Sequence, residues 1–290
     1  MEFARMAAFD LIRPAVRTSC VVFASPHSGR DYPASLLLRS ELDARQIRSS
    51  EDAFVDRLFE TAPLHGAPLL AARAPRAWVD LNRASDEFDP ALIEGVARRP
   101  HNPRVASGLG VIPRVVAGGR AIYSGKIELD EAHERIDSCW TPYHAALQDL
   151  LTESHVEFGE SILIDCHSMP HEAIELAGGP GGRRPHVVLG DRFGAAAAPR
   201  VMARIEAAFV SAGLRVARNT PFAGAYVTQA YGRPSRRQHA IQIEIDRSLY
   251  MDEALVVPHA GFDAFRTRLD RVIAQIAAIG RSEAERVAAE

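Results

Sequence analysis

Short runs of apolar residues alternate along the chain with longer stretches in which apolar residues recur at helical spacing. A run of about four to eight apolar residues predicts a buried strand, and strands that alternate with helices are typical of a parallel or mixed sheet covered by helices. The predicted strands are CVVFAS, PLLAAR, AWVDL, SILIDC, HVVLG, LRVAR, AYVTQ and AIQIEI. The pattern therefore predicts an α/β fold with a central mixed, mostly parallel sheet flanked by helices.

Several stretches carry the helical pattern, in which apolar residues fall on one face and predict helices packed on the sheet. These stretches are 54–62, 131–151, 195–212 and 262–276. Proline lacks the N–H of a helix interior, so Pro142 is expected to interrupt the second of them. Two segments rich in Gly, Pro and Arg, 100–120 and 175–185, are predicted to be loops, and the second is placed to act as a lid over the preceding segment LIDCHSMP.

Size and composition favour a small-molecule enzyme. The chain has 290 residues, 47% of them hydrophobic, and we expect a single α/β domain over residues 1–290. A formal net charge of -3 provides no basic surface for nucleic acid or a membrane, and no stretch approaches the ~18 apolar residues of a membrane span. The 3 cysteines lack CxxC spacing, which argues against disulfides and a structural zinc site and favours a reducing cytoplasm. A monomer or small homo-oligomer is expected.

Polar residues gather where several of these apolar segments end. In open α/β sheets, ligands bind at the carboxyl ends of strands, so residues at these positions are the first candidates for a functional site. The places are PHSG after CVVFAS, the segment WVDLNR, the segment LIDCHSMP, and IQIEIDR, in which isoleucines alternate with Gln242, Glu244 and Asp246. Glu244 thus puts a carboxylate on a strand whose pattern predicts burial.

The segment LIDCHSMP offers a cysteine nucleophile, a serine nucleophile or a metal ligand. Neighbouring residues of a strand point to opposite faces, so Cys166 and His167 diverge while Asp165 and His167 share a side. A dyad of Cys166 with His167 is therefore disfavoured, and Ser168 lies outside a GxSxG nucleophile motif. The open question is whether His167 has distant partners suited to a metal.

Two histidines from different strand ends, with a carboxylate and an open position for water, are typical of a catalytic zinc site. His27 and His167 are the natural pair, and the nearest promising acids are Glu51 and Asp52 at the start of EDAFVDRLF. Ordinary structural roles compete with this interpretation. A single histidine after a strand is more often a hydrogen-bonded structural residue, and an acid in a first helical turn more often interacts with the helix dipole.

A larger set of segments resembles one known family. PHSG, EDAFVDRLF, WVDLNR, YSGK, WTPYHAAL, LIDCHSMP, VVLGDRFG, the YGRP loop and IQIEIDRSLYMDE run in order from about residue 20 to 255 and together resemble the N-formylglutamate amidohydrolases. This family is similar in fold to the zinc carboxypeptidases and aspartoacylases (phosphorylase/hydrolase-like). The resemblance implies one zinc ion held by His27, Asp52 and His167, with Asp52 favoured over Glu51. It implies that Glu244 is the acid and base.

The resemblance also implies that Asn82 and Arg83 receive a substrate carboxylate. A planar guanidinium binds a carboxylate through two hydrogen bonds, so Arg83 is the first choice and Arg233 in YGRPSRR the second. Lys126 or a nearby arginine would neutralise the oxyanion of the reaction. One departure concerns the acidic ligand, which zinc carboxypeptidases take from the third residue after the first histidine. This chain has Arg30 there.

These residues suit hydrolysis of the amide bond of a small N-acyl acidic amino acid. The resemblance implies N-formyl-L-glutamate as substrate, with formate and L-glutamate as products. A zinc aminoacylase or carboxypeptidase-like hydrolase of other N-acyl amino acids or short peptides would use the same residues. A metal- or ligand-binding protein without turnover is the alternative outside enzymes, and there Glu244→Gln would have no catalytic effect.

Overall fold

The computed structural model describes residues 7–97, 102–177 and 184–281. Its 7-stranded sheet has the strand order β1-β3-β2-β4-β7-β5-β6. The strands are β1 (Phe9–Ile12), β2 (Val21–Ser25), β3 (Leu69–Ala72), β4 (Ser161–Met169), β5 (Val187–Gly190), β6 (Val216–Arg218) and β7 (Gln238–Asp246). A separate hairpin pairs β8 (Met251–Asp252) with β9 (Val257–Pro258).

The sheet is mixed and mostly parallel. Strand β4 lies between β2 and β7 and pairs in parallel with both, and β5 pairs in parallel with β6. Strand β5 runs antiparallel to β7. Every residue of β2, β4 and β5 is buried, as expected for strands covered on both faces. The predicted fold class is confirmed.

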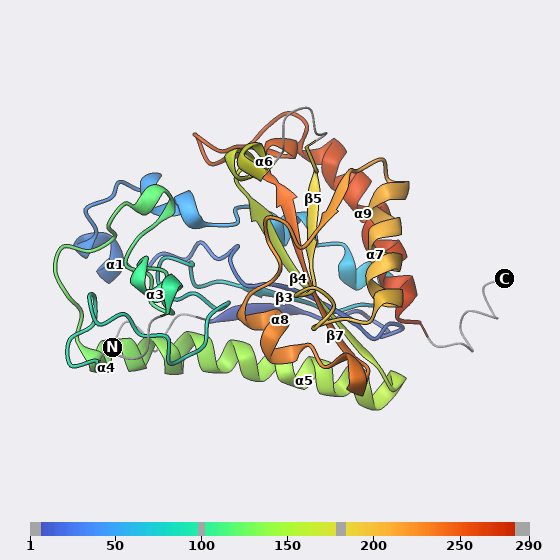
Figure 1. Cartoon of the computed structure of the whole chain (residues 1–290), viewed down its shortest axis with the longest axis horizontal. Coiled ribbons are helices and arrows are strands. Elements are labelled where there is room, and N and C mark those ends of the chain that lie inside the picture. The colour runs from blue at the N-terminus through green and yellow to red at the C-terminus, as the bar shows by residue number, and fades with distance from the viewer. Residues whose placement is uncertain (1–6, 98–101, 178–183, 282–290) are drawn as a thin grey trace. The chain divides into compact units, whose positions relative to one another are not determined.

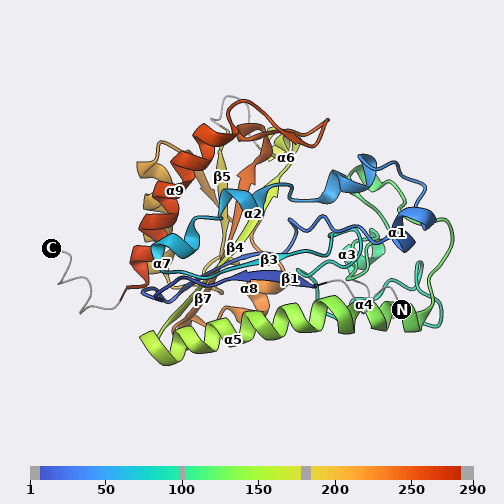
Figure 2. The same cartoon turned by 180° about the vertical axis from the view of Figure 1, so that it is seen from behind.

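The helices are α1 (Ala34–Arg39), α2 (Val55–Leu58), α3 (Pro103–Ala106), α4 (Leu129–Arg135), α5 (Thr141–Phe158), α6 (His171–Ala177), α7 (Pro199–Ser211), α8 (Tyr226–Tyr231) and α9 (Phe262–Ile279). Figures 1 and 2 show α7 and α9 side by side along the sheet. Helix α9 buries Phe265, Leu269, Val272 and Ile276, the face that the apolar spacing predicts. The helix predicted over 262–276 is therefore confirmed, and the helix predicted over 195–212 is confirmed as α7, which begins four residues later at Pro199.

The chain forms two compact units. The first unit contains Met1–Asp10, Pro26–Ala53 and Ala71–Ala146, and the second contains Leu11–Ser25, Phe54–Leu70 and Leu147–Glu290. The division along the sequence falls within β1 and β3 and directly after β2. The single domain over residues 1–290 stays a prediction.

Two predicted strands are wrong. The residues of AWVDL form a turn, in which Trp78 and Val79 donate backbone hydrogen bonds to Pro75 O, and the guanidinium of Arg135 lies over the Trp78 ring. A turn can bury the same apolar side chains as a strand, so a short apolar run does not separate the two. The residues AYVTQ belong mainly to helix α8, which packs against β7 and β4. Tertiary packing there outweighs the strand preference of aromatic and β-branched residues.

The helix predicted over 54–62 is shorter than its pattern. Helix α2 begins at Val55, because Phe54 has a left-handed backbone (φ 67°) and its ring packs edge-on against Phe262. Asp52 therefore lies before the helix and not in its first turn. This frees the Asp52 backbone for a different hydrogen bond, described below.

The helical stretch 131–151 is interrupted, as predicted, by a π-helical segment at Ile136–Trp140 that directly precedes α5 and its Pro142. Most of the predicted lid, residues 178–183 of the loop 175–185, lies outside the described residues. Among the helices of the described ranges, none combines the length and the apolar character needed to cross a bilayer.

Candidate functional site

His27 and Asp52 lie together in the first unit. The backbone N–H of Asp52 donates to the His27 carbonyl oxygen at 2.9 Å, and Asp52 Oδ2 is 3.5 Å from His27 Nδ1. Both side chains are buried. The Glu51 carboxylate is occupied by a two-point ion pair with Arg48 and by a hydrogen bond from the Tyr32 hydroxyl. Of the two acids between which the sequence does not decide, Asp52 is therefore the one beside His27.

Asp80 holds the other nitrogen of the His27 ring. Asp80 Oδ1 is 2.7 Å from His27 Nε2, and Asp80 Oδ2 accepts a hydrogen bond from Arg76 Nε at 3.0 Å. Burial by itself raises the pKa of Asp80, but His27, Arg76 and Arg83 together hold that pKa well below its usual value. Because a carboxylate only accepts hydrogen bonds, Nε2 of His27 carries the proton. Its Nδ1, the nitrogen next to Asp52, is then the one that could bind a metal ion.

Asn82 and Arg83 follow Asp80 and are also buried. The backbone N–H of Asn82 donates to Asp80 Oδ1 at 2.9 Å. The Arg83 guanidinium donates from Nε to Leu109 O and from Nη1 to Asn82 O, which are both neutral carbonyls. Burial lowers the pKa of Arg83, and Asp80 opposes that shift. Arginine remains a cation even so, and neither hydrogen bond uses Nη2, so the group suits an anionic ligand.

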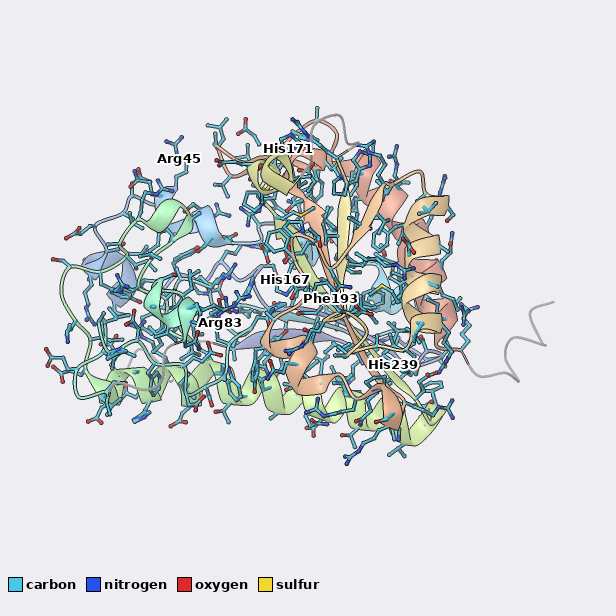
Figure 3. The ribbon with its side chains drawn as sticks, in the orientation of Figure 1. Arg45, Arg83, His167, His171, Phe193 and His239 are labelled. Atoms are coloured by element: carbon cyan, nitrogen blue, oxygen red, sulfur yellow. The ribbon has the colours of Figure 1, made fainter. Side chains whose placement is uncertain are left out.

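His167 lies near the carboxyl end of β4 in the second unit (Figure 3). Its Nε2 is 3.0 Å from Asp165 Oδ1, which confirms that these residues share a side of the strand. In the ladder between β4 and β7, His167 is paired with Glu244 and Asp165 with Gln242, and Gln242 Nε2 donates to Glu244 Oε1 at 2.6 Å. Partners on neighbouring strands point to the same face, so these buried side chains form one polar patch.

The alternative nucleophiles of LIDCHSMP lie on the opposite face of β4. Burial raises the pKa of the Cys166 thiol well above its usual value, and Sγ is 3.5 Å from Ile164 O. Ser168 Oγ accepts a hydrogen bond from Arg247 Nε at 3.1 Å. A protonated thiol is a poor nucleophile, and an arginine cannot take the proton of a serine hydroxyl. The geometry favours the metal interpretation of this segment.

Two further predicted residues are exposed. Lys126, in the first unit, donates from Nζ to Pro90 O at 3.2 Å. Arg233, in the second unit, donates from Nη1 to the carbonyl oxygens of Gln229 and Gly232, both at 2.7 Å. Their predicted contacts with substrate stay predictions.

The sequence and the fold both match known proteins. Residues 19–251 match the model of a family described as N-formylglutamate amidohydrolase. The chain belongs to this family. An N-formylglutamate deformylase of Pseudomonas aeruginosa is 31% identical over 236 residues, which are 80% of this chain and 82% of that protein. Its counterpart in Pseudomonas putida is 28% identical over the same shares of both chains.

One solved structure agrees with this family membership, and a second agrees with the fold. The crystal structure of an N-formylglutamate amidohydrolase from Ralstonia eutropha superposes with a TM-score of 0.88 and 34% identity, covering 95% of this chain and 99% of that one. A gene product of Agrobacterium tumefaciens has a TM-score of 0.64 at 15% identity and covers 94% of this chain and 96% of that one. The second likeness supports the fold alone.

The family match includes every predicted site residue, from His27 to Glu244. The contact of Asp80 with His27 was not predicted. The spacing of Asp165 and His167, two residues apart on one strand, predicted that they share a side but not their 3.0 Å contact. The contact of Asp80 with His27 joins residues 53 positions apart, which no local spacing reveals.

Proposed function

We propose that this chain hydrolyses the amide bond of N-formyl-L-glutamate to formate and L-glutamate, with one divalent metal ion, zinc, as cofactor. The observation that carries the proposal is the membership of the N-formylglutamate amidohydrolase family over residues 19–251, together with relatives that are named deformylases and align over 80% of the chain. The buried polar groups described above are proposed to supply the chemistry of this reaction.

The proposed metal ligands suit zinc. His27, Asp52 and His167 are buried, and two histidines with one aspartate are a set that could hold a metal ion. Each histidine has its Nε2 beside a carboxylate, Asp80 or Asp165. A carboxylate that is hydrogen-bonded to the ring, as Asp80 is to His27, orients a metal-ligating imidazole and raises its basicity, which leaves Nδ1 of His27 for the metal.

The course of the chain supports placing the ligands in one site. Strand β2 ends at Ser25, and His27 follows after a single residue. Strand β2 is the parallel neighbour of β4, with Ala24 beside Asp165, so the chain leaves β2 at the edge of the sheet where β4 presents His167. Functional groups of α/β sheets gather at the carboxyl ends of adjacent strands. His27 is accordingly proposed to share its metal ion with His167.

Glu244 is the proposed acid and base. It is the ladder partner of His167, and Gln242 holds its Oε1. When bound, zinc would supply a water molecule of lowered pKa and a positive charge for the formyl oxygen. Glu244 would accept a proton from the water as its oxygen attacks the formyl carbon, and would pass the proton to the glutamate nitrogen as the C–N bond breaks.

Arg83 is the proposed partner of a substrate carboxylate. It is a buried cation whose hydrogen bonds go to neutral carbonyls, so an anionic ligand would offset the cost of burying its charge. Asn82 lies beside it in the sequence and would add an amide donor. Arg233 is proposed for a second carboxylate contact and Lys126 for the oxyanion, on the basis of their charge alone.

The test measures formate and L-glutamate released from N-formyl-L-glutamate, together with the metal content of the same sample. We expect equal amounts of both products, loss of turnover after dialysis against a chelator, and recovery when zinc is restored. Parallel assays with N-acetyl-L-glutamate and N-formyl-L-leucine distinguish recognition of the formyl group from recognition of the acidic side chain. Full activity without metal would contradict the zinc proposal, and no formate from the zinc-loaded protein would contradict the substrate.

Asp80→Asn is expected to weaken zinc binding by about 10- to 100-fold, because it removes the carboxylate that orients His27. A competition titration with a chromophoric chelator measures this change directly. Asp86→Asn, the same substitution at an exposed position of the first unit, is the matched control and should bind zinc like the wild type. Equal zinc affinity of the Asp80→Asn variant and the wild type would show that Asp80 has no role at the metal.

A further inference from the structure

The turn at residues 80–83 is fixed by side chains that lie far along the sequence. His144 Nε2 donates to Leu81 O at 2.9 Å, and Trp140 Nε1 donates to Arg83 O at 2.9 Å. The turn belongs to no helix or strand, so these carbonyl groups accept hydrogen bonds from side chains and not from the backbone of a helix or a neighbouring strand. The two hydrogen bonds hold the backbone on both sides of Asn82.

Trp140 and His144 form a single rigid donor pair. Their ring centroids are 3.9 Å apart with planes at 32°, as expected for residues four positions apart on a helix. Burial lowers the pKa of His144 to about 4, against the opposing hydrogen bond to Leu81, so the ring is neutral at pH 7 and Nε2 carries its proton. The two neighbouring rings thus donate to two carbonyls of one turn, and neither ring carries a charge.

The local backbone explains how Trp140 reaches the turn. It is the last residue of the π-helical segment Ile136–Trp140, which separates α4 from α5. A π-helical turn inserts one residue into the helical repeat and rotates the side chains that follow, and such turns are frequent at functional sites. The π-helical interruption of the long helix therefore orients the Trp140 indole toward Arg83 O.

We propose that Trp140 and His144 are positioning residues that hold Arg83 in place for a substrate carboxylate. The inference rests on the proposed function in taking Arg83 as the carboxylate ligand. A guanidinium binds a carboxylate through two parallel hydrogen bonds, and this geometry tolerates little movement of the arginine backbone. Because such binding is shared by the ground state and the transition state, loss of the positioning contacts raises KM and leaves kcat nearly unchanged.

Trp140→Phe tests this role with the least disturbance, because it keeps an aromatic ring over His144 and removes the N–H donor. We expect KM for N-formyl-L-glutamate to rise about tenfold with kcat within about twofold of the wild type, as for loss of one hydrogen bond near a charged group. Calorimetric affinity for glutarate, a dicarboxylate without an amide, should fall by the same factor. Glutarate binding does not depend on turnover, so it reports on carboxylate binding apart from the chemical step.

A double-mutant cycle separates positioning from general damage to the fold. In an Arg83→Met background, Trp140→Phe should cause no further loss of glutarate affinity, because both changes remove the same contact. His144→Gln, which keeps an N–H donor for Leu81 O, should retain more affinity than His144→Leu. Zinc content should stay at the wild-type value in Trp140→Phe, and Tm should fall only slightly, because a single hydrogen bond to the Arg83 carbonyl is lost. A loss of affinity that persists in the Arg83→Met background would mean general damage and would overturn the inference.

The remaining outcomes distinguish this inference from the proposed function. If Trp140→Phe binds glutarate like the wild type while Arg83→Met does not, the positioning role is wrong and the proposed function stands. If the wild type releases no formate but glutarate binding responds to both substitutions, the proposed substrate is wrong and the positioning role stands. If Arg83→Met binds glutarate with the same affinity as the wild type, Arg83 does not bind a carboxylate, and the positioning role of Trp140 and His144 is also wrong.

Discussion

Replacing His167 by alanine is expected to abolish stoichiometric zinc binding and the release of formate. Loss of an outer partner of a ligating histidine commonly costs about 10- to 100-fold in metal affinity, so loss of the proposed ligand itself should exceed about 100-fold. When the variant and the wild type are compared at equal protein concentration and limiting zinc, the turnover rate should fall by at least the same factor. The remaining His27 and Asp52 provide only two protein ligands. Metal analysis after dialysis and a formate assay on the same sample measure both effects.

Cys166→Ala is the matched control for this variant. Cys166 is buried, is the direct neighbour of His167 on β4, and points to the opposite face of the sheet. Its replacement should lower Tm slightly through a small cavity and leave zinc content and turnover unchanged. An alanine variant of His167 that retains one zinc per chain and normal turnover would mean that this histidine is structural, and the mechanism proposed above would be wrong.

The apolar pattern predicts the parts of the fold that lie in regular, fully buried elements. The runs SILIDC and AIQIEI correspond to β4 and β7, and every residue of β4 is buried, so its sequence carries a clear strand signal. The pattern does not predict the register between these two strands. The pairing of His167 with Glu244 depends on how distant segments pack together, and neither run contains information about its partner's alignment.

The turn at residues 80–83 is a place where the apolar pattern predicts the wrong backbone structure. Its apolar residues suggest a strand, but the backbone is held by Trp140 and His144, about 60 positions later, instead of by a neighbouring strand. Hydrogen bonds from side chains to isolated carbonyls leave no periodic trace in the sequence. The prediction of polar residues at this place was useful even so, because Asn82 and Arg83 are buried there.

The choice between Glu51 and Asp52 has the same physical origin. Both acids are buried and adjacent, so neither composition nor spacing identifies which of them is the metal ligand. The structure distinguishes them because Arg48 and Tyr32 engage the Glu51 carboxylate, whereas the Asp52 carboxylate lies beside His27. The family resemblance favoured Asp52 on the position of its motif, and the geometry now supports the same residue on independent grounds.

Glu244→Gln is expected to lower kcat by about 10²- to 10⁴-fold while zinc content stays at the wild-type level. An amide cannot take a proton from water or return it to the leaving nitrogen, and a positioned acid and base contributes about this factor to catalysis. The fold should tolerate the change, because the glutamine oxygen can still accept the hydrogen bond from Gln242 Nε2. KM should change little if Glu244 acts mainly on the chemical step.

The same substitution at Glu157, on the exposed surface of α5, is the matched control and should behave like the wild type. Single-turnover measurements with zinc-loaded enzyme would separate the chemical step from product release. A Glu244→Gln variant that keeps kcat within about twofold would assign the proton transfer to another group or to solvent. A variant that loses its zinc would instead place Glu244 among the groups that hold the metal. Only a fall in kcat at full zinc occupancy separates a chemical role from a binding role for this carboxylate.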